Sequence, residues 1–310
     1  MRAVYLTPHS TFPSVFPSNT LFGAICTGLF DLDYDLDDLI ERYPEDPAFI
    51  LSSAFPYLNA GGAIHHFLPS PLLPPPKIRL EEDFDKAKAF KKVRYIHEAV
   101  FHDLAGGKLR REDIIGDLDN YAVESGMLAR KREYLPLDRA EMEIPHNRIN
   151  RITSESEEFY HTYGSIFRRG GRYFLIRFYD RAWEAPVEAA LRLLEDRGVG
   201  PRTSGGQGQF SLSFGEMEIP EDAGAPYLMS LSRFAPESLA AFEGRVWYDL
   251  VSIRGRSGDG VMKKSVRMLS EGSVFANLYR PSYGTMATVR DSPRVVEYGM
   301  AFPVGIRWSG

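Results

Sequence analysis

The stretch Gly198-Val-Gly-Pro-Arg-Thr-Ser-Gly-Gly-Gln-Gly-Gln-Phe210 decides how the chain is interpreted, because of the elements expected on either side of it. Residues 185–197 carry an apolar stripe at helical spacing, and Gly198 stands where a C-cap glycine belongs, which predicts a helix. Residues 209–214 are typical of a strand. The glycine-rich loop therefore leads from a helix into a strand. Common phosphate-binding loops lead from a strand into a helix.

Known catalytic and nucleotide-binding motifs do not fit this loop. No Lys-Ser/Thr pair follows Gly205 or Gly206, which excludes a Walker motif, and the dinucleotide pattern lacks its third glycine. A Gly-x-Ser-x-Gly nucleophile elbow is also missing from the sequence. What remains is a flexible loop with one cation, Arg202, whose backbone N–H groups can wrap a phosphodiester chain.

The neighbouring segments indicate an α+β fold. Residues 172–179 are rich in aromatic and β-branched side chains and predict a strand, as do residues 160–167. Arg168-Arg-Gly-Gly171 is expected to join them as a hairpin turn. The order strand, strand, helix, loop, strand is most of a split βαβ, or ferredoxin-like, unit. Alternating segments from residue 226 onward predict a second, smaller α+β unit.

The first half of the chain contains further predicted elements. Residues 3–6 predict a strand, and Asn19-Thr20 can cap a following helix. The proline-rich stretch 69–76 predicts an extended spacer. Residues 83–104 have apolar side chains near helical spacing and predict one long helix. Residues 60–159 as a whole are interpreted as an insertion.

Composition limits the classes of function. The chain of 310 residues has 44% hydrophobic and 25% charged residues, as ordinary globular proteins do. A single cysteine, Cys26, fits a reducing cytoplasm and excludes an intramolecular disulfide. No apolar run approaches membrane-spanning length and no signal-peptide pattern is present, so we expect a cytoplasmic protein without a membrane partner.

The net charge of −5 hides a strong segregation of charge. Residues 1–59 hold two Arg and eight acidic side chains, whereas residues 245–294 hold nine Lys or Arg and four acidic ones. Residues 148–181 are also basic. Such asymmetry indicates one surface for an anionic partner and another, acidic one that faces a protein.

The histidines do not form a recognisable metal or catalytic motif. His97 and His102 are five residues apart, unlike the i,i+4 pair of a zinc-binding helix. His65-His66 has no companion cysteine, and nothing local orients His9, although it follows the first strand. We therefore predict no metal site, no cofactor and no catalytic residue.

Two further polar stretches suit RNA. His146-Asn-Arg-Ile-Asn-Arg-Ile-Thr153 places Arg148 and Arg151 among amides and hydroxyls, which can contact phosphates and 2′-hydroxyl groups. Lys263-Lys264-Ser-Val-Arg-Met-Leu-Ser-Glu-Gly-Ser-Val-Phe275 combines basic residues with a glycine-containing turn. Together with the glycine-rich loop, these stretches predict a track for a polyanion.

The ordered combination of these motifs resembles a known family. Ser18-Asn-Thr-Leu-Phe-Gly-Ala24 resembles the Ser-Asp-Thr-Leu-Phe-Gly-Ala motif of RAMP proteins in type III CRISPR effector complexes. The glycine-rich loop after a helix, the His146-Asn-Arg-Ile segment and the Glu271-Gly-Ser-Val-Phe275 turn occur in the same order in subunit four of Csm complexes. The resemblance spans residues 5–302 and is weakest across 60–145. Asn19 replaces the aspartate that this family often has.

The resemblance implies a fold and a function. It implies two ferredoxin-like (RRM-like) units, with residues 1–215 as the first, interrupted by the insertion, and residues 216–310 as the second. It also implies a non-catalytic, RNA-binding subunit that grips the 5′ tag of a crRNA and joins the large subunit to subunit three of the Csm backbone. A thumb-like hairpin in the insertion would contact the guide–target duplex, so target RNA is an indirect partner.

The predicted RNA contacts come from all of these motifs, and the resemblance leaves two alternatives open. Phe22 or Tyr283 is expected to stack on a splayed base. The alternatives are a metal-independent crRNA-processing endoribonuclease of the RAMP superfamily, which needs a histidine such as His9, and the equivalent cap subunit of a Cmr complex. The predicted contacts are Ser18, Asn19, Phe22, His146, Asn147, Arg148, Arg151, Gly198, Gly200, Arg202, Thr203, Ser204, Gly205, Gly206, Gln207, Gly208, Lys263, Lys264, Arg267 and Tyr283.

Overall fold

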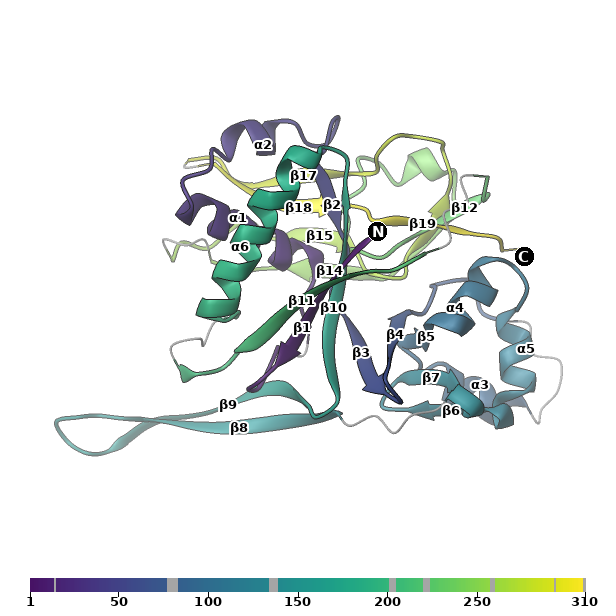
Figure 1. Ribbon diagram of the computed structural model, residues 1–310, viewed down its shortest axis with the longest axis horizontal. Helices are drawn as coiled ribbons and strands as arrows, with labels where there is room; N and C mark the ends of the chain where they lie inside the picture. Colours follow the sequence, from purple (N-terminus) through teal and green to yellow (C-terminus); the bar gives the residue numbers. More distant parts are fainter. Residues whose placement is uncertain are drawn as a thin grey trace.

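The structure is a computed structural model that describes residues 1–13, 15–76, 83–133, 139–200, 205–219, 224–256, 260–292 and 294–308. As the sequence predicts, the fold is α+β, with sheets, extended hairpins and a few helices (Figure 1). In the described residues, no helix is long and apolar enough to cross a membrane.

The first strand, β1, lies next to the edge strand β11 of the central sheet. Strand β1 lies between β10 and β11 and is antiparallel to both, and β10 pairs on its other side with β2 and β3. In chain order the elements are β1 (Arg2–Pro8), α1 (Ser18–Asp31), α2 (Asp37–Glu41), β2 (Phe49–Leu51), β3 (Phe55–Ala60), β10 (Gly170–Phe178), η3 (Arg181–Trp183), α6 (Glu184–Arg197) and β11 (Phe210–Glu216).

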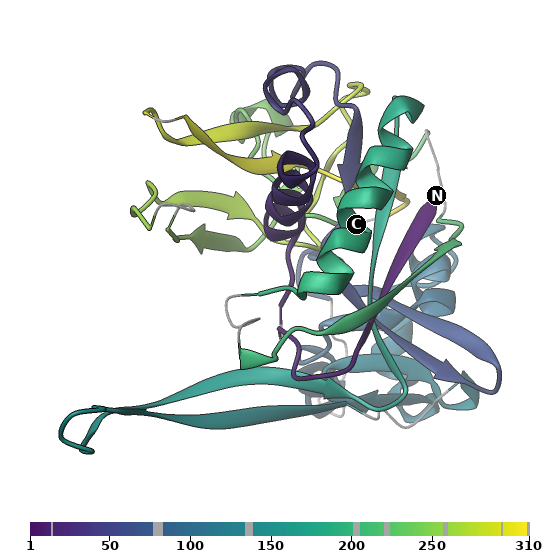
Figure 2. The same ribbon diagram turned by 60° about the vertical axis from the view of Figure 1, so that its left-hand side comes forward.

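Helices α1 and α6 pack side by side on one face of this sheet (Figure 2). They approach closely at Gly28, where an added Cβ would lie 3.0 Å from the Cβ of Ala190. The buried side chains of α6 are Val187, Ala190 and Leu191, three members of the predicted stripe. The predicted helix 185–197 and the strands at 3–6, 172–179 and 209–214 are therefore confirmed, with ends that differ by one or two residues.

The insertion extends the central sheet instead of forming the predicted long helix. Residues 83–104 divide into α3, a strand that pairs with β4 and β7, and α4. The helix prediction was wrong because β5 gains its ladder partners from distant segments, which helical spacing cannot reveal. The elements are β4 (Ala63–Pro69), α3 (Asp83–Phe90), β5 (Tyr95–His97), α4 (Glu98–Ala105), α5 (Arg111–Gly116), η1 (Leu118–Asn120), β6 (Tyr121–Glu124), β7 (Met127–Arg130) and η2 (Lys131–Glu133).

A long two-stranded arm projects from the body of the protein (Figures 1 and 2). It consists of β8 (Arg139–Ile149) paired with β9 (Ser156–Phe167). The predicted hairpin between residues 160–167 and 172–179 is wrong. Gly170 and Gly171 instead permit close strand packing, because a Cβ there would lie 2.1 Å from the Tyr57 carbonyl oxygen or 2.2 Å from that of Leu6.

The C-terminal part contains a small sheet and two separate hairpins. The small sheet has the order β13-β16-β12-β19, and the hairpins are β14–β15 and β17–β18. The description of this part as a second ferredoxin-like unit, and the domain boundary near residue 215, stay predictions. The elements are β12 (Tyr227–Ser230), η5 (Ala240–Phe242), β13 (Val246–Trp247), β14 (Leu250–Ile253), β15 (Val266–Leu269), β16 (Val274–Ala276), β17 (Gly284–Arg290), β18 (Val295–Met300) and β19 (Pro303–Ile306).

One hydrophobic core joins the C-terminal part to the central sheet and α1. Phe22 of α1 stacks on Tyr298 of β18 with a ring-centroid distance of 4.5 Å. The hydroxyl group of Tyr298 accepts a hydrogen bond of 3.1 Å from the Leu51 amide. Apolar burial of this extent is the main favourable term in folding. It fixes the C-terminal hairpins relative to the rest of the chain.

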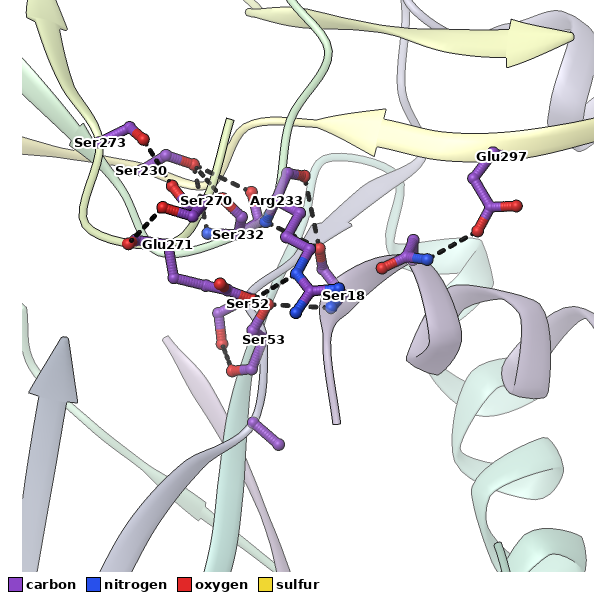
Figure 3. Close-up of polar contacts among 12 residues, drawn as sticks. Ser18, Ser52, Ser53, Ser230, Ser232, Arg233, Ser270, Glu271, Ser273 and Glu297 are labelled. Atoms are coloured by element: carbon purple, nitrogen blue, oxygen red, sulfur yellow. Dashed lines mark hydrogen bonds and ion pairs between the residues drawn. The ribbon is translucent and has the colours of Figure 1, made fainter. Parts of the chain in front are cut away.

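A buried polar cluster, here called the Ser–Arg–Glu lock, adds directional contacts at this junction (Figure 3). The Ser18 amide donates to Ser53 Oγ at 2.9 Å, and Ser53 Oγ donates to Glu271 Oε1 at 2.6 Å. Arg233 Nε lies 3.3 Å from the same carboxylate oxygen, and the Arg233 amide donates to Ser18 Oγ at 3.1 Å. Both charged side chains are mostly buried, so the charge of each compensates the desolvation cost of the other.

A second buried polar cluster lies where the insertion meets the central sheet. His66 Nε2 is 2.9 Å from Tyr5 Oη, and its Nδ1 is 2.7 Å from Glu98 Oε2. His65 Nδ1 is 3.2 Å from His97 Nε2. These contacts join β1, β4 and α4. Among the described residues, no group of three or more His, Cys, Asp or Glu side chains is arranged to hold a metal ion.

The Ser–Arg–Glu lock predicts a large effect of a single substitution. Glu271→Ala leaves the guanidinium of Arg233 buried without its carboxylate, and we expect a loss of about 2–4 kcal/mol in the free energy of unfolding. Chemical denaturation measures it. The matched control is Glu237→Ala, because Glu237 and Arg280 are 3.7 Å apart on the surface and should contribute at most about 1 kcal/mol. Equal losses of unfolding free energy in both variants would contradict the stabilising role of the Ser–Arg–Glu lock.

The histidine cluster predicts acid-sensitive stability. Burial lowers the pKa of His97 below its ordinary value of 6.5. Burial opposes ionisation of Glu98, but the hydrogen bond and charge of His66 lower its pKa below 4.5 overall. Both groups hold fewer protons when folded, so their contribution to stability is complete above these ordinary values and is lost as the pH falls through the lowered ones.

We therefore expect the free energy of unfolding to decrease below pH 6.5 and again below pH 4.5. His97→Gln should reduce the first decrease, because glutamine does not titrate, while His161→Gln on the exposed arm should leave it unchanged. Urea unfolding at a series of pH values provides the measurement. An identical pH profile for His97→Gln and the parent protein would show that His97 is not responsible.

Candidate nucleic-acid interface

The glycine-rich loop is closed at its base by the backbone. Gly198 at the end of α6 has φ 78° and donates to the Leu194 carbonyl at 2.8 Å. The Val199 amide then donates to the Gly208 carbonyl at 3.0 Å. Gly208 has φ 75°, and a Cβ there would lie 1.8 Å from the Val199 carbonyl oxygen. Glycine is therefore required at 208 by both conformation and space.

The loop that follows β1 supports the glycine-rich loop from the other side. The Gly208 amide donates to the Thr11 carbonyl at 3.0 Å, and the Gln209 amide donates to Ser10 Oγ at 3.0 Å. The His9 amide donates to the Gln209 carbonyl at 2.8 Å. Ser10 and Thr11 are not among the site residues predicted from the sequence. Their position in a polar segment directly after the first strand was the available signal.

The same segment also holds the base of the arm. Phe12 and Ser165 of β9 exchange two backbone hydrogen bonds, of 2.9 and 2.8 Å. A Cβ at Gly164 would lie 2.1 Å from the Thr11 side chain. Residues 9–12 thus fix the glycine-rich loop and the arm relative to each other. We call the convergence of residues 9–13, 164–165, 198–200 and 205–209 the loop–arm junction.

At this junction Gly205 and Gly206 are exposed, and among the described residues no atom lies within 4 Å of a Cβ added at either position. Gly200 is also exposed, while Gln207 is half-buried. Backbone N–H groups in such a loop can approach phosphate closely. The predicted contacts Arg202, Thr203 and Ser204 lie outside the described residues.

The predicted segment 146–153 lies on the arm and forms its outer end. The Asn150 side-chain oxygen accepts from the amides of Ile152 at 2.9 Å and Thr153 at 3.3 Å, which organises the tip. Ile152 is 94% exposed there. His146 stacks on Tyr160 with a centroid distance of 5.1 Å. The tip therefore presents Ile152 on an ordered turn, next to the exposed Ile149 at the end of β8.

The arm carries both charged and exposed aromatic side chains. Arg148 is exposed and lies 3.9 Å from both Glu157 and Glu158, which partly compensate its charge. Asn147 and Arg151 are exposed as well. Phe159 and Tyr163 are each 68% exposed on β9. Exposed aromatic rings on a rigid ribbon can stack on unpaired bases.

Four predicted contacts near the Ser18 motif and the C-terminus are not available to RNA. Ser18 is buried in the Ser–Arg–Glu lock, and Asn19 is buried and donates to Glu297 Oε1 at 2.6 Å instead of capping α1. Phe22 is buried against Tyr298, and Tyr283 is 7% exposed. The expectation that Phe22 or Tyr283 stacks on a base is wrong.

The C-terminal basic stretch is divided between a buried and an exposed part. Lys263 is 19% exposed, and its Nζ lies 2.7 Å from Glu297, so its charge stabilises the interior. Lys264 and Arg267 are exposed, with Lys264 2.7 Å from the exposed Asp291. The arm and the two C-terminal hairpins project on the same side of the protein, with the glycine-rich loop between them (Figures 1 and 2).

Comparisons with known proteins bear on the family and the fold of the chain. No family model matches the sequence. The chain is 25% identical over 313 residues to a curated protein of Thermococcus onnurineus (strain NA1), "CRISPR system Cms protein Csm4", with 98% of this chain and 96% of the relative covered.

Solved structures share the fold. The chain superposes with a TM-score of 0.70 and 19% identity on a chain of the Csm3–Csm4 subcomplex of the type III-A CRISPR-Cas interference complex, covering all of both chains. A chain of the Csm1–Csm4 cassette in complex with pppApA gives a TM-score of 0.68 at 23% identity, with 99% and 98% covered. The resemblance that the ordered motifs predicted is therefore confirmed: along nearly its whole length, the chain is similar to Csm4.

Proposed function

We propose that this protein is the crRNA-binding subunit four of a type III-A CRISPR (Csm) effector complex, and that it holds the 5′ tag of the crRNA without catalysing a reaction. The loop–arm junction is the observation that carries the proposal. It presents exposed backbone at Gly205 and Gly206 on a base that the segment 9–12 fixes in place. A preorganised loop binds a flexible chain at a lower entropic cost than a mobile one.

Backbone recognition explains why this loop needs few side chains. Amide groups of exposed glycines donate to phosphate oxygens, and the missing side chains let the RNA backbone come close. The hairpin β14–β15 projects on the same side as the arm (Figure 2). Lys264, just before β15, and Arg267, in β15, are exposed and would add counterion release, which makes binding depend on salt. In this proposal the sheet β11-β1-β10-β3, with α1 and α6, acts as a ferredoxin-like support for the loop.

The arm fits the role of the thumb. Its ordered tip presents Ile152 to solvent, and apolar wedges of this kind can open a base step at the cost of some stacking energy. Arg148 and Arg151 near the tip would contact phosphates on either side of the opened step. We propose that the arm contacts the duplex of guide and target RNA, whereas the glycine-rich loop holds the unpaired tag.

The protein partners follow from the same proposal. Structures of relatives contain Csm1 with Csm4 and Csm3 with Csm4. We propose that this chain likewise joins the large subunit to the backbone subunit, with two ferredoxin-like units divided near residue 215, in the cytoplasm. A Cmr complex would require the same grip on RNA with other protein partners, so co-purified subunits distinguish the two assignments.

The endoribonuclease alternative depends on one observation. His9 is exposed beside the glycine-rich loop, and its Nε2 is hydrogen bonded to Ser211 Oγ. We assign His9 to support of the loop, because its backbone also pairs with Gln209. Cleavage of repeat RNA by the purified protein in EDTA, lost in His9→Ala, would favour the enzyme and overturn the non-catalytic assignment.

The junction predicts different outcomes for two glycine-to-alanine substitutions. Gly208→Ala forces a Cβ against the Val199 carbonyl and should reduce affinity for the crRNA tag at least tenfold. The control is Gly23→Ala on α1, outside the junction, where an added Cβ meets no described atom within 4 Å, and it should leave affinity within about twofold. Fluorescence anisotropy with a 5′-labelled tag oligonucleotide, sequenced from RNA that co-purifies with the complex, measures both.

Thermal unfolding of both variants provides the control for general damage. The comparison is valid when Gly208→Ala remains folded at the assay temperature, because the substitution strains only the base of a surface loop. Unaltered tag binding by a folded Gly208→Ala variant would contradict the proposal. An equal loss of affinity in Gly23→Ala would show that the effect is not specific to the base of the loop, and would overturn the role given to that base.

A further inference from the structure

An exposed apolar strip lies at the end of α1. Phe30 is 69% exposed, Leu32 is 38% exposed and Tyr34 is 39% exposed. In the sequence these three residues alternate with acidic ones, as Phe30-Asp-Leu-Asp-Tyr-Asp35. Aromatic and aliphatic side chains that stay exposed together are typical of protein interaction sites. The role in RNA binding proposed above does not use this strip.

The strip is held in one conformation by the backbone. The Asp33 amide donates to the Phe30 carbonyl at 3.0 Å, and the Tyr34 amide donates to the Leu29 carbonyl at 3.0 Å. Asp33 has φ 62°, so the helix ends in a Schellman turn. The Tyr34 ring also lies 6.4 Å from that of Trp183. A surface fixed in this way loses little conformational entropy when a partner covers it.

Uncompensated negative charge surrounds the strip. Residues 30–46 contain eight carboxylates and one cation, Arg42. Asp31 pairs with Arg197 and Asp46 pairs with Arg42. For the exposed Asp33, Asp37, Asp38 and Glu41, the described part of the chain provides no ion pair. This rim repels RNA and anionic lipid, and it attracts a cationic protein surface.

We infer that the strip Phe30–Tyr34 with its acidic rim is the docking surface for a neighbouring protein subunit of the effector complex, one that offers an apolar pocket bordered by Lys or Arg. The inference rests on the proposed function, which it deepens by locating a protein interface. Helix α2, which continues the acidic rim, lies at the opposite end of the protein from the arm (Figures 1 and 2). A partner bound there leaves the loop–arm junction accessible to RNA.

The test uses the full chain co-expressed with the other complex subunits and a CRISPR array. The variant Phe30→Ser with Asp38→Lys removes the most exposed apolar side chain and reverses one rim charge. We expect at least a tenfold loss of either the large subunit or the backbone subunit from affinity-purified protein, with the crRNA tag affinity of the isolated chain unchanged. The matched control is Phe84→Ser with Glu112→Lys, because Phe84 is 68% exposed on α3, outside the strip.

Each outcome supports or contradicts the docking surface. Retention of all protein subunits by a folded variant would overturn it. Loss of tag affinity in the isolated variant would assign the strip to RNA, and a change in self-association alone would assign it to a second copy of this chain. If the parent protein purifies with neither crRNA nor subunits, the proposed function fails instead, and this result is distinct from the others.

Discussion

The proposed RNA-binding surface depends on the closure of the glycine-rich loop by one backbone hydrogen bond, from the Val199 amide to the Gly208 carbonyl. The bond can form because Gly208 has no Cβ and adopts a positive φ. The Gly208 amide is then free to bond Thr11, which also packs on the base of the arm. A single constraint thus orients both elements to which we assign RNA contacts, the loop and the arm.

The Ser–Arg–Glu lock is a structural contact, whereas its sequence motifs were interpreted as part of an RNA-binding site. Ser18 and Glu271 belong to two motifs that support the family resemblance, and Ser18 was predicted to contact RNA. In the structure they meet through Ser53 and Arg233, far apart in sequence, at the junction of the central sheet and the C-terminal part. A recognisable motif therefore indicates a structural contact here, and its buried polar groups stabilise the fold that carries the interface.

How much of the fold the sequence predicts depends on how far apart in the sequence the interacting residues lie. Helix α6 and strand β11 were predicted correctly, because apolar periodicity and the glycine after the helix are local signals. Strand β5 was missed, since only pairing with β4 and β7 makes it a strand. Gly170 was interpreted as part of a turn, although it serves close packing against β3.

The same distinction applies to the site. The loop glycines were proposed as RNA contacts because glycine-rich segments have a direct conformational meaning, and this stays a prediction. Phe22 and Tyr283 were placed wrongly because burial depends on the whole fold. The charge of Lys263 was counted as available for RNA, and only the structure shows that Glu297 binds it. Ser10 and Thr11 carry no motif, and they enter the site only through three-dimensional contacts with the loop.

The most direct test of the central claim is photo-crosslinking of the assembled complex, with 4-thiouridine in the crRNA tag or in the target RNA and mass spectrometry of the linked peptides. We predict that the tag crosslinks to residues 9–13 and 205–209, and that target RNA crosslinks to the tip of the arm around Ile152. Tag crosslinks confined to the acidic residues 30–46, or absent from this chain altogether in a complex that contains crRNA, would contradict the account.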